Sequence, residues 1–133
     1  MFLKICQICV HFCIRYILKA IRKGAEQRPQ CTGQWFKMSF DNLIISSCAL
    51  GAAYEGLMGT TKYTESSAKE FNKEFPELNN MFVQSSSVTK YFGHSDSGSQ
   101  RAVSLNTRIG VLNDQEGWSR ERIADWLEQE YNL

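Results

Sequence analysis

The sequence predicts a mainly α protein, built as a single small domain of about four to five helices. Length is the first reason, because 133 residues suit one domain of ordinary size. Composition is the second: 43% hydrophobic and 22% charged residues with only 2 Pro and 9 Gly are typical of a globular protein and exclude disordered and collagen-like chains. The third is that apolar residues recur at steps of three and four in several segments, as on one face of a helix.

The first helix is expected in the N-terminal part of the chain and ends before Pro29. Its apolar face is formed by Ile5, Cys9, Phe12, Cys13, Tyr16, Ile17, Ala20 and Ile21. Basic and polar residues interrupt this pattern, so its apolar runs are much shorter than the roughly 18 residues of a membrane-spanning helix. Basic residues beside an aromatic face also suit an anionic interface, which leaves membrane-surface contact by residues 1–23 as an alternative.

The candidate metal ligands of the chain all lie in this helix: Cys6, Cys9, His11 and Cys13. Zinc prefers thiolate and imidazole ligands, but a structural zinc site normally takes some of them from a turn, and this segment has no Gly or Pro to form one. We therefore expect these cysteines to pack as small hydrophobic residues and predict neither a metal nor a cofactor. The total of five cysteines is odd, which argues against a disulfide framework and favours a reducing cytoplasm.

Residues 30–40 are expected to form a loop or short hairpin, after which a second helix follows. Asp41 is the expected N-cap of that helix and Gly56 its end. Residues 48–53 carry small side chains, which let another helix approach closely, so we expect them at the centre of the fold. Cys48 is a candidate nucleophile, but a buried structural thiol is favoured because the chain has only two histidines to serve as a base.

Shorter elements are expected in the second half of the chain. Ser66 or Ser67 is expected to cap a third helix. Residues near 81–92 are expected to form short strands or helical turns. Residues 103–112 are expected to form a helix, with a short strand as the rival interpretation. Ser119 is the expected N-cap of the last helix. The inward face of that helix is predicted to consist of Ile123, Trp126, Leu127 and Tyr131.

The charge of the chain is unevenly distributed, although the net charge is only +1. Residues 1–40 carry a net charge of +6 and residues 41–133 a net charge of −5, which favours attraction within the fold or between copies. Residues 119–127 look like the first helix of a bacterial helix-turn-helix. The C-terminal segment is acidic, however, and a helix-turn-helix protein needs a second helix to contact bases in the major groove. We therefore expect no nucleic-acid binding.

Several short motifs, taken in order, resemble those of a known family. They occupy residues 20–25, 28–30, 33–36, 47–56, 75–78, 112–114 and 117–127. With its Cys-Ala-Leu-Gly-Ala helix and its Leu-Asn-Asp turn, the chain from about residue 17 to 133 resembles a family of small uncharacterised bacterial and phage proteins, a domain of unknown function. The resemblance implies a mostly helical fold and a bacterial or phage source. It divides the chain into an amphipathic N-terminal extension outside the core, residues 1–16, and a single helical domain, residues 17–133.

No enzyme signature is present in the sequence, which lacks a phosphate-binding glycine loop and a His-Glu-x-x-His motif. The favoured function is therefore a small cytoplasmic protein that acts through protein interaction, with an unknown partner or with itself. The alternative is an enzyme or small-ligand protein that uses the polar residues of the family-like motifs, Cys48, Glu55, Asn113 and Asp114. We expect Asn113 and Asp114 to be structural and to bond free amides at the turn and at the start of the last helix.

Overall fold

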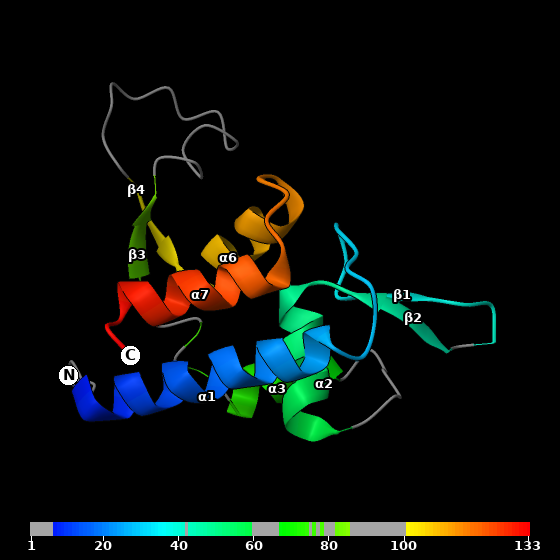
Figure 1. The fold of residues 1–133 in the computed structure, drawn as a ribbon, viewed down its shortest axis with the longest axis horizontal. Coiled ribbons are helices and arrows are strands. Elements are labelled where there is room, and N and C mark those ends of the chain that lie inside the picture. Colours follow the sequence, from blue (N-terminus) through cyan, green and yellow to red (C-terminus); the bar gives the residue numbers. More distant parts are fainter. Residues whose placement is uncertain are drawn as a thin grey trace.

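The computed structural model describes residues 7–41, 43–59, 67–74, 76, 78, 82–85 and 101–133. Its helices are α1 (Gln7–Ala25), α2 (Ala49–Met58), α3 (Ser67–Glu74), α6 (Leu105–Asp114) and α7 (Arg120–Glu130) (Figure 1). Its strands are β1 (Phe36–Met38), β2 (Ile44–Ser47), β3 (Phe82–Ser85) and β4 (Arg101–Ser104). The strands pair as two antiparallel hairpins, β1 with β2 and β3 with β4. The prediction of a small, mainly α domain is confirmed.

Helix α1 is central to the core and packs against both α2 and α7. Figure 1 shows α7 alongside α1 and running in the opposite direction. The fully buried aliphatic side chains of α1 are Ile14, Ile17, Leu18 and Ile21. Helix α6 adds Leu105, Ile109 and Leu112 to the same cluster, at helical spacing. Each such side chain contributes roughly 1.5–3 kcal/mol when it is fully buried, so this cluster holds the helices together.

Close packing between α1 and α2 depends on glycine at two positions. Gly24 on α1 lies against the carbonyl oxygen of Ala52 on α2, and Gly56 on α2 lies against the carbonyl oxygen of Ala20 on α1. A methyl group added at either glycine would overlap the facing carbonyl group. The prediction that the small residues of this helix lie at the centre of the fold is therefore confirmed.

The expected start of the second helix at Asp41 is wrong. Ile44–Ser47 form strand β2, and α2 begins only after Cys48, its N-cap. Two β-branched isoleucines followed by two serines suit a strand better than a helix, and β1 supplies their hydrogen-bond partners. The helix also continues past Gly56 and ends at its C-cap Gly59, whose φ of 63° lies in the left-handed region.

The sequence predicted one apolar face on α1, but the structure divides its apolar residues between a buried side and an exposed side. Phe12 and Tyr16 are 72% and 51% exposed, whereas Cys13 packs against the core. The expected face is therefore divided: its aromatic side chains Phe12 and Tyr16 are exposed, whereas Ile17, Ala20 and Ile21 lie in the core. Ile14 is fully buried, and α1 runs without a break across residue 16. This burial argues against a core that begins at residue 17.

N-cap residues determine where the two C-terminal helices begin. Helix α6 begins after Ser104, whose Oγ accepts a hydrogen bond from the backbone amide of Thr107 at 3.2 Å. Helix α7 begins after Ser119, as predicted, and the Oγ of Ser119 accepts from the amide of Arg122 at 3.1 Å. Gly117, in the turn between these helices, has a φ of 68°. A short polar side chain at each N-cap thus satisfies an amide that the helix leaves free.

The strand and helix expectations for the second half are largely confirmed. Strand β3 falls within residues 81–92, of which 81 and 86–92 lie outside the described residues. The segment 103–112 divides between the end of β4 and the helix α6 that was the favoured interpretation. On the inward face of α7, Ile123 and Leu127 are buried and Trp126 and Tyr131 half-buried.

Candidate functional site

Three of the four polar candidates meet at the N-terminal end of α2. Cys48 caps that end, and Asn113 and Asp114 lie at the C-terminal end of α6. The loop between α1 and β1, residues 26–35, joins them there through hydrogen bonds. Glu55 lies seven residues further along α2, about 10 Å away at 1.5 Å per residue, and makes a separate contact.

Asn113 is almost fully buried, and its side-chain amide has a partner in every direction. Its Oδ1 accepts hydrogen bonds from the backbone amide of Ala49 at 3.0 Å and from Nε2 of Gln30 at 2.8 Å. Its Nδ2 donates to the carbonyl oxygen of Cys31 at 2.9 Å and to Oδ1 of Asp114 at 2.7 Å. These bonds use the full capacity of an amide side chain. Asn113 therefore caps α2 from another helix and has no free group for a substrate.

Asp114 is exposed and fastens the 26–35 loop to α6. Its Oδ1 accepts from the backbone amide of Gly33 at 2.9 Å as well as from Asn113. Gly33 has a φ of 79°, a left-handed conformation that glycine adopts without strain. The pair does bond free backbone amides, but these belong to α2 and the loop. The expected partners in the turn and the last helix are wrong, because the fold brings the more distant segments into reach.

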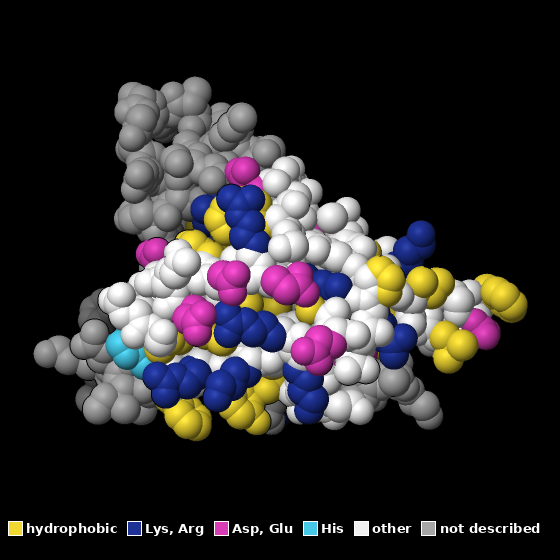
Figure 2. Space-filling view, in the orientation of Figure 1, with side chains coloured by type: hydrophobic (Ala, Val, Ile, Leu, Met, Phe, Trp, Pro, Cys, Tyr) yellow, Lys and Arg dark blue, Asp and Glu magenta, His cyan; other side chains and the backbone are white. Residues whose placement is uncertain are grey.

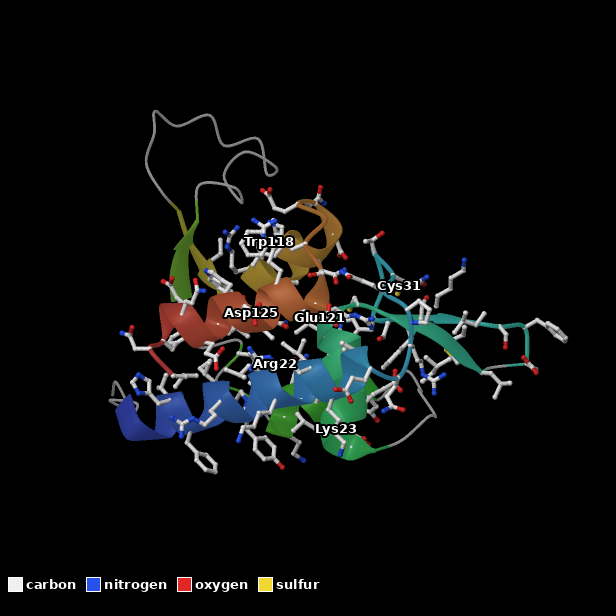
Figure 3. The ribbon with its side chains drawn as sticks, viewed as in Figure 1. Arg22, Lys23, Cys31, Trp118, Glu121 and Asp125 are labelled. Atoms are coloured by element: carbon white, nitrogen blue, oxygen red, sulfur yellow. The ribbon has the colours of Figure 1, made fainter. Side chains whose placement is uncertain are left out.

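Cys48 is a buried thiol at the N-cap of α2. Its Sγ accepts from the backbone amide of Gly51 at 3.4 Å. Burial raises the pKa of the Cys48 thiol to about 11. The thiol is therefore protonated at neutral pH, whereas a cysteine nucleophile must be a thiolate. Cys31, labelled on the loop in Figure 3, is half-exposed and donates to the carbonyl oxygen of Gln34 at 3.6 Å.

Glu55 forms a mostly buried ion pair with Arg28 of the loop. Nε of Arg28 lies 3.0 Å and 3.2 Å from the two carboxylate oxygens, and the Glu55 side chain is 5% exposed. Nη1 of Arg28 also donates to the carbonyl oxygen of Ile44 at 2.6 Å. A buried carboxylate needs a paired charge to offset its lost hydration, and Arg28 supplies it. The pair ties the loop to α2 and β2.

Arg120 is a buried residue for which the sequence suggested no role. Its Nη2 donates to the carbonyl oxygen of Arg28 at 2.6 Å, and its Nη1 donates to Oγ of Ser47 at 2.9 Å. Burial lowers the pKa of Arg120, although an arginine guanidinium keeps its charge in proteins. One signal was present: Arg120 precedes Ile123 by three positions and Leu127 by seven, which puts it on the apolar face of its helix.

The candidate metal ligands do not assemble in the described part of the chain. Cys6 lies outside the described residues, as does the side chain of Cys9. His11 and Cys13 are half-buried on α1. Among the residues that the structure describes, no three His, Cys, Asp or Glu side chains gather where they could hold a metal ion.

Large exposed apolar side chains lie away from this polar cluster, on the β1–β2 hairpin and its turn, residues 36–47, which we call the arm. Phe40 at the turn is fully exposed, and Leu43 and Ile45 are 61% and 47% exposed. Figure 2 shows the arm as a projection that carries hydrophobic side chains toward its end. Within the described ranges, none of the helices combines the length and the apolar character that crossing a membrane requires.

Comparisons with known proteins give no match to this chain: no family model, no curated protein and no solved structure corresponds to it. The resemblance to a bacterial and phage family therefore stays a prediction.

Proposed function

We propose that this protein is a small cytoplasmic interaction protein of bacterial or phage origin, an accessory factor that binds a partner protein through the arm. The observation that carries the proposal is the exposure of Phe40, Leu43 and Ile45 on one projecting hairpin. Single exposed apolar residues are common, but a group of them on one element marks an interaction site. The family resemblance supports the bacterial or phage source, and the absence of a disulfide at Cys31 and Cys48 supports a reducing compartment.

The base of the arm is anchored in the core. Phe36 and Ile44, one from each strand, are buried. The carbonyl oxygen of Ile44 accepts from Arg28, and Ser47 is bridged to Gln30 on the other side of β2. These contacts hold the direction in which the arm projects.

The turn of the arm is shaped by its own hydrogen bonds. The amide of Ser39 donates to the carbonyl oxygen of Leu43 at 2.8 Å, and the amide of Leu43 donates to Oγ of Ser39 at 3.2 Å. The Ser39 hydroxyl also donates to the carboxylate of Asp41. Residues that such bonds already hold lose less conformational entropy on binding, which favours association. The partner surface that fits is an apolar groove, because Phe40, Leu43 and Ile45 present only hydrocarbon.

The alternative of an enzyme or small-ligand protein has weaker support. Cys48, Asn113 and Asp114 bond the backbone of α2 and the loop, and Glu55 is paired with Arg28. Residues used in this way stabilise the fold and leave few groups to meet a substrate.

The experiment that tests this proposal is photo-crosslinking in cells of the source organism. Phe40 is replaced by p-benzoylphenylalanine in the full chain, and in a control protein the same group replaces Glu121, an exposed residue of α7. We expect a discrete adduct from position 40 and none of the same mass from position 121. Unlabelled wild-type protein should compete for the adduct, and the variant Phe40→Ser/Ile45→Thr should compete at least about 30-fold less well, since apolar hot spots contribute about 2 kcal/mol or more.

The mass of the adduct identifies the kind of partner. An adduct of twice 15.2 kDa means that the arm joins two copies of the chain, and any other discrete mass means a different protein. Absence of an adduct from position 40, or an equal pattern from position 121, would overturn the proposal. Thermal unfolding of the competitor variant at the wild-type midpoint shows that it is folded.

A further inference from the structure

The outer face of α1 carries a row of exposed basic and aromatic side chains. It consists of Phe12, Arg15, Tyr16, Lys19 and Lys23, all of them exposed. Their positions follow the helical repeat over about 16 Å, at 1.5 Å per residue, so they form one continuous stripe. We infer that this stripe, the basic-aromatic stripe, binds the surface of a lipid bilayer that contains anionic headgroups. The inference does not depend on the arm.

The helix that carries the stripe offers its basic side chains no acidic partner. Helix α1 contains no Asp or Glu, and Glu26 follows one position after its end. Within the part of the chain that the structure describes, Arg15, Lys19 and Lys23 form no ion pair. Their positive charge is therefore available to an anionic surface.

Arg22 is a basic residue of α1 whose charge is paired within the fold. It faces α7, where its Nη2 lies 2.8 Å from Asp125 and 2.9 Å from Glu128 (Figure 3). These carboxylates raise the pKa of Arg22, so its charge is already compensated. The acidic residues of α7 thus compensate Arg22 on one side of α1. In Figure 2, further basic side chains gather along the lower edge of the same view.

The aromatic pair gives the stripe an apolar component. The rings of Phe12 and Tyr16 stack on each other with centroids 6.4 Å apart, and the two residues are 72% and 51% exposed. Exposed aromatic rings beside lysine and arginine are typical of helices that lie in the plane of a membrane interface. There the rings enter the boundary of the headgroups and acyl chains, and the long basic side chains reach the headgroup phosphates.

A bilayer surface fits this stripe better than an acidic protein does. The stripe lies on the convex outside of a single helix, so it offers no groove that would hold a peptide in register. A membrane surface needs no groove, because it adapts to a helix and presents many negative charges at once. Attraction of this kind weakens as salt screens the charges, which gives the inference a direct test.

The test is co-sedimentation of the full chain with vesicles of phosphatidylcholine alone or with phosphatidylserine added. We expect binding only to the phosphatidylserine vesicles, and weaker binding at high salt. The variant Lys19→Gln/Lys23→Gln should bind about 25-fold more weakly, at about fivefold for each charge removed. The variant Phe12→Ser/Tyr16→Ser should lose binding even at low salt, when its basic residues are intact.

The matched control is Lys69→Gln/Lys73→Gln, which removes two exposed basic residues of α3 and leaves the net charge equal to that of the stripe variant. It should bind like the wild type. The inference is overturned if the protein binds both vesicle types alike, or if the control variant loses as much vesicle binding as the stripe variant. It is also overturned if the protein binds polyglutamate, an acidic polypeptide, but binds neither type of vesicle. Thermal unfolding of every variant at the wild-type midpoint excludes loss of the fold as the cause.

Discussion

Asn113, near the end of α6, accepts a hydrogen bond at 3.0 Å from the backbone amide of Ala49, the first residue of α2, 64 positions away in the chain. The first amides of a helix have no partner within it, and here two side chains supply partners. The Sγ of Cys48, the N-cap of α2, accepts a hydrogen bond from the amide of Gly51. The Oδ1 of Asn113, on α6, accepts one from the amide of Ala49. The start of α2 is therefore completed only when α6 is in place.

The first prediction compares the two neighbours at the end of α6. Asn113→Ala is expected to lower the free energy of unfolding by about 3 kcal/mol, because it leaves several buried polar groups without partners. Asp114→Ala is expected to lower it by only about 1 kcal/mol, the usual effect of removing an exposed hydrogen-bond acceptor. Urea denaturation measures both. A loss for Asp114→Ala equal to that of Asn113→Ala would contradict the assigned roles.

The second prediction concerns the contact between α1 and α2. Gly56→Ala places a methyl group against the carbonyl of Ala20, so it should destabilise the protein by about 1–3 kcal/mol, as overpacking of a core does. Gly110→Ala is the matched control, because a methyl group at this helical position meets nothing within 4 Å. It should stabilise the protein by up to about 1 kcal/mol, the difference in helix propensity. Thermal midpoints that shift in the same direction for both variants would contradict the close helix packing.

The third prediction concerns pH. Burial raises the pKa of the Cys48 thiol from 9.0 to about 11. Between these values the unfolded chain loses this proton while the folded chain keeps it, so the contribution to stability is complete below pH 9 and is lost as the pH rises toward 11. From pH 7 to pH 10 the wild type should lose about 1.4 kcal/mol more than Cys48→Ala does. Urea denaturation at both pH values checks this. Equal losses of unfolding free energy in the wild type and Cys48→Ala would show that the fold does not raise the pKa of the thiol.

The fourth prediction separates the two faces of α1. Ile14→Ala should lower the free energy of unfolding by about 2–5 kcal/mol, because it removes a fully buried side chain. Phe12→Ala, two positions away on the exposed face, should change it by less than about 0.5 kcal/mol. Chemical denaturation followed by circular dichroism gives both values. A small effect of Ile14→Ala would instead support the expectation that the core begins at residue 17.

The expectations that proved accurate rest on short-range signals. Ser119 followed by an amphipathic segment predicted α7, and its side chain does accept an amide of the first turn. The small residues of 49–53 predicted a close helix contact, because side-chain size limits how near two backbones can come. Such features act within a few residues and are visible in the order of residues alone.

The errors share one cause, which is pairing with distant segments. Asp41 offered a plausible N-cap, but β1 paired with residues 44–47 and moved the helix start to Cys48. On α1, the expected face grouped Phe12 and Tyr16 with Ile17 and Ile21, but packing in the tertiary structure leaves the two aromatic side chains exposed and buries Ile14 instead.

The sequence by itself determined the fold class, the N-cap of the last helix and four polar residues of the candidate site, since helix periodicity and capping depend on neighbours in the chain. Only the tertiary structure decided what those polar residues do. Asn113 bonds an amide 64 positions away, and Arg120 donates to a carbonyl oxygen 92 positions away. Partners so distant come together only when the hydrophobic core forms and brings buried amides and carbonyls within reach, where the cost of leaving them without a hydrogen bond determines which side chain each one binds.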